Sequence, residues 1–285
     1  MILLYAFISM FGWGIGDFFG ATLARKVGVI RSLFWSYLIG LVLSSLIVIV
    51  FINSIQLSIV GAVYAIVGGF FHIVGSIMFF KGFKTSKIGI VSTITSLYSL
   101  VIVIFGVFVF KESLSESQWV AILLALVGVT VLSFDIHKLS SNLKVDFGGK
   151  GIFFSIITMF AWSTAWILFR EAVRESSWIL PQFVFNLLSF LVLVIYGKAS
   201  KADLSLPKDK KMILLIFSDA VFTLIGLVSY SIGIMNFYTS IITPFSSSYP
   251  IVTTLLGRIF YKEKLHLLKY IGITLVIAGV IVLNL

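Results

Sequence analysis

The sequence predicts an all-α membrane protein with ten transmembrane helices arranged as two inverted five-helix repeats. Three observations lead to this class: the composition, a series of long apolar runs, and an internal repeat. Of 285 residues, 60% are hydrophobic and 11% are charged, and the mean hydropathy is +1.15. A soluble domain carries roughly 25% charged residues, so this chain is too apolar to form a water-facing surface. Cysteine is absent, which excludes disulfides and thiolate metal sites.

Ten apolar runs follow one another along the chain. They cover roughly residues 2–23, 32–52, 57–80, 88–110, 117–134, 150–169, 178–196, 211–235, 239–260 and 265–284. Nearly all have the length of about 17–25 residues that a helix needs to cross hydrocarbon. The runs are continuous rather than alternating, which favours helices over a barrel. The first run lacks a basic leader and a small-residue cleavage site, so we expect a span rather than a signal peptide.

An internal repeat divides the chain in two. Residues 98–132 and 249–283 align without a gap at an offset of 151 positions, and 12 of the 35 aligned residues are identical. The identical residues include a tyrosine, a Lys-Glu pair and two glycines. Because these residue types rarely coincide through apolar composition alone, the alignment predicts two structural repeats, at residues 1–145 and 146–285.

The basic residues predict how the repeats are oriented. Of the 21 Lys and Arg residues, 18 lie in the odd-numbered connections, and only Lys111, Arg170 and Arg174 lie in the even-numbered ones. The odd connections are therefore expected in the cytoplasm and both termini outside. Each repeat has five spans, so the second enters the membrane from the opposite side. The net charge of +10 then belongs to a cytoplasmic rim, where lipid headgroups rather than nucleic acid are the expected partner.

Two short motifs recur at equivalent places in both repeats. They are Phe110-Lys111-Glu112-Ser113-Leu114 and Tyr261-Lys262-Glu263-Lys264-Leu265 after the fourth and ninth spans, and Gly128-Val129 and Gly279-Val280 in the helices that follow. The first span also contains Phe11-Gly12-Trp13-Gly14. In these features the whole chain resembles the EamA-type permeases of the drug/metabolite transporter superfamily. The resemblance implies a multi-pass carrier in the cell membrane. The resemblance does not identify a substrate, and Asp17 is not part of the motifs that this chain shares with the family.

Three ionisable residues lie well inside predicted spans, and we expect them to couple transport to a proton gradient. They are Asp17, His72 and Asp219. A carboxylate at the centre of a membrane helix costs about 2.5–3.5 kcal/mol on insertion scales, so these groups should face the bundle interior. A rise of about 1.5 Å per residue puts all three in one layer of the cytoplasmic half. The alternative is that each is neutral, hydrogen-bonded and structural.

Eight residues are candidates for contact with a substrate. They are Trp13, Tyr98, Trp162, Trp166, Gln182, Asn186, Ser246 and Tyr249. The two tyrosines occupy equivalent places near the middle of their spans, and Pro244 and Pro250 should bend the ninth span beside them. Other roles remain open: the tryptophans could be packing residues, the serine could bridge helices, and Gln182 and Asn186 could pair with each other.

These features favour a secondary transporter of a small organic metabolite, such as an amino acid, that works by alternating access. No ATP-binding motif is present, so an ion or substrate gradient must supply the energy. A channel or a lipid-handling membrane scaffold is the alternative, and an intramembrane enzyme is a third class, although no nucleophile motif or HExxH is present. We expect no catalytic residue, metal or cofactor. The expected partners are a small molecule and membrane lipids, and the expected functional unit is a monomer.

Overall fold

The computed structural model describes residues 1–85, 88–133, 149–262 and 265–284. The helices of the first half are α1 (Ile2–Val27), α2 (Val29–Val50), the short 3-10 helix η1 (Ile52–Ser54), α3 (Ile59–Thr85), α4 (Ile88–Ser96), α5 (Tyr98–Phe108) and α6 (Glu116–Ser133). Those of the second half are α7 (Lys150–Glu175), α8 (Leu180–Ala199), α9 (Lys210–Asn236), α10 (Thr239–Ser246), α11 (Pro250–Tyr261) and α12 (Leu267–Leu283). The predicted repeat boundary at 145/146, Glu263 and Lys264 lie outside the described residues.

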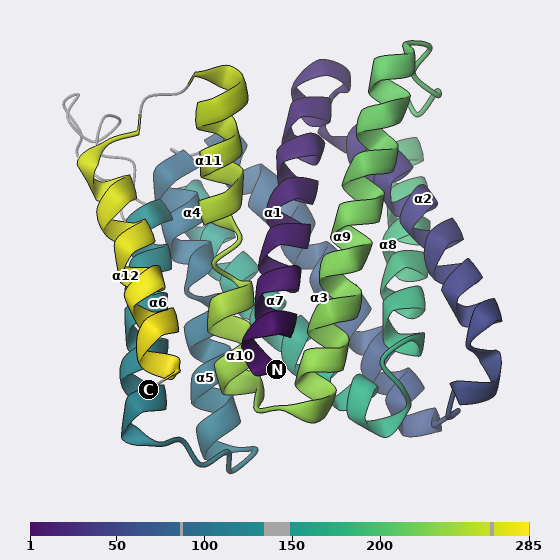
Figure 1. The fold of residues 1–285 in the computed structure, drawn as a ribbon. Helices are drawn as coiled ribbons and strands as arrows, with labels where there is room; N and C mark the ends of the chain where they lie inside the picture. Colours follow the sequence, from purple (N-terminus) through teal and green to yellow (C-terminus); the bar gives the residue numbers. More distant parts are fainter. Residues whose placement is uncertain (86–87, 134–148, 263–264, 285) are drawn as a thin grey trace.

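The predicted ten spans are confirmed, with two of them broken. Eight helical segments in the described ranges are long and apolar enough to cross a membrane, by length and composition, and residues 91–108 at the α4–α5 junction count as one of them. The ninth span consists of α10 and α11, which stand end to end in one column (Figure 1). The last, α12, has 17 residues.

Both broken spans are interrupted at hydroxyl-rich sequence. Pro250 is the first residue of α11, where its missing amide costs no helical hydrogen bond. The hydroxyls of Ser247 and Ser248 donate to the carbonyl of Pro244 at 3.0 and 2.9 Å, so local side chains satisfy the backbone at the break. The break between α4 and α5, at Leu97, has no proline. Hydroxyls bond to the backbone there as well, since Ser96 donates to the carbonyl of Thr93 at 2.8 Å and Ser99 to that of Ser96 at 3.1 Å.

The two halves pack on each other through symmetric pairs of helices. α1 lies along α9, and α3 lies along α7, which is the same contact with the halves exchanged. The pairs α2–α8 and α6–α12 each join equivalent helices. Every one of these interfaces joins the first half to the second, and each core cluster of the described residues takes members from both halves.

Close contacts between α6 and α12 repeat the symmetry at single residues. A Cβ added at Gly128 would lie 2.8 Å from the carbonyl oxygen of Gly272, and one added at Gly279 would lie 2.7 Å from that of Ala121. The two contacts exchange under the 151-residue offset, and only glycine permits backbones to approach this closely.

The bundle has two distinct ends. The chain starts and finishes at the same end, at the bottom of Figure 1, which we call the terminal end. The largest core cluster lies in the halves of the helices nearest this end. Its buried members are Ala6, Val103, Ala121, Ile122, Ala125, Phe169, Val173, Phe185, Leu227, Tyr230, Ile234, Ile241, Ile242 and Phe245. The terminal end is thus filled by packed side chains between the two halves.

Candidate functional site

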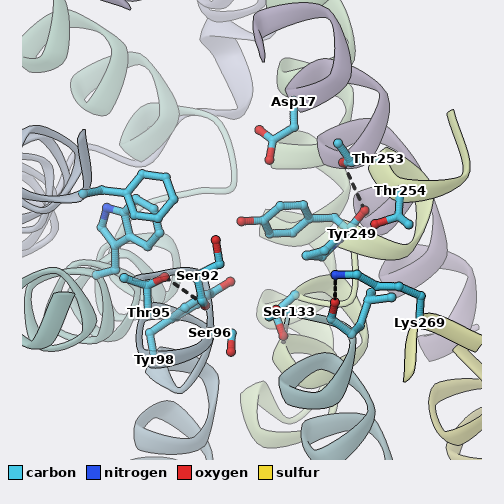
Figure 2. Close-up of a pocket in the computed structure, with 15 residues that line it drawn as sticks. Asp17, Ser92, Thr95, Ser96, Tyr98, Ser133, Tyr249, Thr253, Thr254 and Lys269 are labelled. Carbon is cyan, nitrogen blue, oxygen red and sulfur yellow. Dashed lines mark hydrogen bonds between the residues drawn. The ribbon is translucent and has the colours of Figure 1, made fainter. Parts of the chain in front are cut away.

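Three cavities that share lining residues occupy the middle of the bundle. The first, of about 340 Å³, extends from Tyr98 and Tyr249 toward Ser133 and Lys269 (Figure 2). Ser133 ends α6 and Lys269 lies near the start of α12, at the end of these helices opposite the termini. The second, of about 150 Å³, is a crevice between α1, α2, α8 and α9. The third, of about 270 Å³, has mainly aromatic walls. The first cavity has a volume that suits a small organic ligand.

Two aromatic pairs form opposite walls and are related by the repeat. Trp13 meets Tyr249 edge to face, with ring centroids 6.2 Å apart and an interplanar angle of 87°. Trp162 meets Tyr98 with 6.0 Å and 84°. Each pair takes its tryptophan from one half and its tyrosine from the other. The inverted repeat therefore builds the cavity from two copies of one arrangement.

Glycines on neighbouring helices make room for both indoles. A Cβ added at Gly226 would lie 2.6 Å from Cδ1 of Trp13, and a Cβ added at Gly75 would lie 2.5 Å from Cδ1 of Trp162. Gly75 and Gly226 are again 151 positions apart. Trp166 completes the wall: its ring centroid is 5.3 Å from that of Trp13. The three tryptophans are fixed by packing and also line the aromatic cavity.

Asp17 lies where the cavities meet. It is the one residue that lines all three of those described here. Its side chain is exposed to this internal space although it lies in the middle of α1, and it points toward the hydroxyl end of Tyr249 in Figure 2. A carboxylate in this position is open to water or a ligand inside the bundle.

Asp219 lies on the narrow crevice that Asp17 also lines. Its carboxylate accepts hydrogen bonds from the hydroxyls of Ser36, at 2.5 Å, and Thr223, at 3.3 Å. A Cβ added at Gly20 would come within 3.1 Å of this carboxylate, so the glycine lets it lie directly against α1. Asp219 is thus held by two donors, whereas Asp17 faces open space.

His72 faces the aromatic cavity rather than the crevice. Its ring centroid lies 5.8 Å from that of Trp166 and 5.5 Å from that of Phe185. Its Nδ1 is buried and has no hydrogen-bond partner among the described residues. A buried imidazole nitrogen without a partner is available to a ligand group or a water molecule. No cluster of three His, Asp or Glu side chains suited to a metal ion occurs in the described ranges.

Two of the eight substrate-contact candidates lie away from the three cavities. Gln182 is 2% exposed, and its amide donates to the Ser231 hydroxyl at 3.2 Å on α9. Ser246 is fully buried, and its neighbour Ser247, which follows the last residue of α10, lines the cavity instead. Asn186 lines both the crevice and the aromatic cavity and donates to the carbonyl of Gln182 at 3.1 Å.

Sequence reasoning missed a basic group on the cavity wall. Lys269 of α12 lines the same cavity as Asp17, and its ammonium donates to the carbonyl of Leu132 (Figure 2). The hydroxyl residues Ser92, Ser96 and Thr254 line the space beside it. The sequence assigns Lys269 to the basic cytoplasmic rim. The signal for a cavity position is that it is the only charged residue inside the apolar run 265–284.

The fold and cavity define an inverted-repeat membrane transporter, and comparisons with known proteins agree. The model of the EamA-like transporter family matches residues 1–134 and 149–285, so the chain belongs to this family. It is 23% identical over 213 residues to an uncharacterised transporter from Archaeoglobus fulgidus, covering 74% of this chain and 71% of that protein. A protein crystal structure shares the fold, with a TM-score of 0.80 and 16% identity, over 99% of this chain and 96% of the other.

Proposed function

We propose that the protein is a secondary active transporter that moves a small organic metabolite by alternating access and couples the movement to protons. The observation that carries the proposal is the place of Asp17, a carboxylate open to a central cavity that both halves build. A group that exchanges protons at such a point can be reached from one side of the membrane at a time. His72 and Asp219 are the proposed partners of Asp17 in this step.

An amino acid or a similar zwitterion is the proposed substrate. Asp17 and Lys269 line one cavity, so it offers a negative group for an ammonium and a positive group for a carboxylate. Trp13, Tyr98 and Tyr249 offer an apolar surface for a side chain between them. In this proposal Trp162, Trp166 and Asn186 complete the contacts.

The basic connections support a cell-membrane location with both termini extracytoplasmic. Because the interfaces described above all lie between the two halves, a single chain supplies the whole pathway, and we propose a functional monomer. Membrane lipids are its surroundings and a small molecule its cargo. No catalytic step is assigned to any residue.

The experiment is substrate flux with purified protein in sealed proteoliposomes. A thermal-shift screen of metabolites, amino acids first, selects the compounds to test. We expect saturable uptake of a stabilising compound that increases with an imposed pH gradient. Unsaturable conductance would replace the proposal with a channel, and conversion of the compound without flux would replace it with an enzyme.

A further inference from the structure

The two repeats differ in how their fourth helices pack. α10 packs against α5 and α6 near the terminal end. The equivalent contacts in the other half would join α4 to α11 and α12, and no comparable packing is present among the described residues. The cavity extends toward the end where this packing is missing, since Ser133 at the end of α6 and Lys269 at the start of α12 line it. The structure is therefore one access state, closed at the terminal end.

Glu112 fastens α10 at the closed end. It lies between α5 and α6 of the first half and is 5% exposed. Its carboxylate oxygens accept hydrogen bonds from the backbone amides of Thr239 and Ser240, each at 2.9 Å, and from the Ser240 hydroxyl. These amides are the first of α10, where the helix dipole also favours a negative charge. One carboxylate of the first half thus caps a helix of the second.

Arg170 of α7 lies beside the carboxylate of Glu112, and the two residues form a buried cluster at the N-terminus of α10. Arg170 is 6% exposed, and its Nη2 lies 3.8 Å from Oε1 of Glu112. Its guanidinium carbon lies 3.5 Å from the ring centroid of Phe110, and it also pairs with Glu171. Removing one partner of a buried ion pair leaves an uncompensated charge and is strongly unfavourable. The cluster is therefore stable when complete, and loses several interactions at once if α10 moves.

We propose that Glu112 and Arg170 form the lock of the terminal gate: together they hold the N-terminus of α10 against α5 and α6, and this contact must break before the cavity opens to the terminal side. The inference rests on the proposed function, because a gate has a purpose only in a protein that alternates its access. Glu112 and Arg170 act by positioning α10 and lie outside the three cavities.

The first test measures access to the cavity and needs no substrate. The chain has no cysteine, so Ser96→Cys gives one reactive thiol on the cavity wall. A membrane-impermeant maleimide should label it from one face of sealed vesicles at least about tenfold faster than from the other. Glu112→Gln weakens charge-assisted hydrogen bonds, so labelling from the slow face should rise about tenfold. Glu116→Gln, which removes an exposed charge nearby, should leave both rates unchanged.

The second test fixes the gate covalently. An added Cβ at Gly106 would lie 3.3 Å from Cβ of Ser240, close to the roughly 3.5–4.5 Å of a disulfide. The pair Gly106→Cys and Ser240→Cys joins α5 to α10. Its oxidation should stop flux and slow-face labelling of Ser96→Cys, and a reductant should restore both. Each single cysteine variant is the control and should not respond to oxidant.

Either test can overturn the lock. If Glu112→Gln and Arg170→Gln label like Glu116→Gln from both faces, the cluster does not control access. If the oxidised double variant transports as fast as the reduced one, α10 does not move away from α5. Failure of the proposed function gives a different result, in which no compound is transported while labelling still responds to Glu112→Gln.

Discussion

The indole of Trp13 and the ring of Tyr249 meet edge to face across the two halves, with centroids 6.2 Å apart. The same geometry joins Trp162 to Tyr98 on the other side of the cavity. Two copies of one contact lie on opposite walls. In the proposed alternating-access mechanism, a substrate would therefore meet similar surfaces in both access states, as in other inverted-repeat transporters.

A first prediction concerns the glycines that contact the two indoles, Gly226 at Trp13 and Gly75 at Trp162. Gly226→Ala places a methyl group 2.6 Å from Cδ1 of Trp13, so the indole must shift, which disturbs its edge-to-face contact with Tyr249. An aromatic pair contributes about 0.5–1.5 kcal/mol, and its loss should weaken substrate binding by about threefold to tenfold. Binding by calorimetry measures the effect. Leu123→Ala, at a half-exposed position on α6, is the control, and equal affinity of the two variants would contradict the assigned cavity wall.

Lys269 provides a second prediction. If its ammonium faces the carboxylate of a zwitterionic substrate, Lys269→Met should weaken binding of the amino acid by about tenfold or more, because hydrogen bonds to charged groups contribute about 1.5–3 kcal/mol. Binding of the corresponding amine, which has no carboxylate, should change little. Lys262→Met removes an exposed charge and serves as the control. An equal loss for the amino acid and the amine would show that Lys269 stabilises the cavity wall rather than the carboxylate.

The distribution of basic residues provides a third prediction. A reporter fused after residue 285 should be extracytoplasmic, and one inserted in the connection between α8 and α9 should be cytoplasmic. The physical reason is the excess of Lys and Arg in the odd-numbered connections. Enzymatic reporters that are active on only one side of the membrane measure both positions. A cytoplasmic C-terminus would reverse the assignment of the closed, terminal end.

Much of the fold could be read from the sequence because the membrane imposes a simple rule on it. Spans must be long, apolar and helical, and the 151-residue offset related their positions. The break at Leu97 was missed because no proline marks it. Proline marks the break near Pro250, but the sequence does not show which side chains of the three serines face the cavity, and Ser247 lines it rather than the predicted Ser246.

The site was only partly predictable, for reasons of geometry. Asp17 was found because a carboxylate inside a span has few structural explanations. Gln182 was chosen for its polarity, but its side chain packs against α9, and the azimuth of a helix cannot be read from a uniformly apolar sequence. The role of Glu112 was hidden because its partners are backbone amides of Thr239 and Ser240, which carry no residue signature.

The most direct measurement of the central proposal is accumulation of the transported compound in proteoliposomes, with and without a pH gradient, for the wild type, Asp17→Asn and Asp219→Asn. Asn occupies nearly the same space as Asp but cannot exchange a proton near neutral pH. We predict that Asp17→Asn loses the response to the gradient and that Asp219→Asn, whose carboxylate is held by Ser36 and Thr223, loses less of it. Wild-type, pH-dependent accumulation by both variants would contradict proton coupling through these carboxylates.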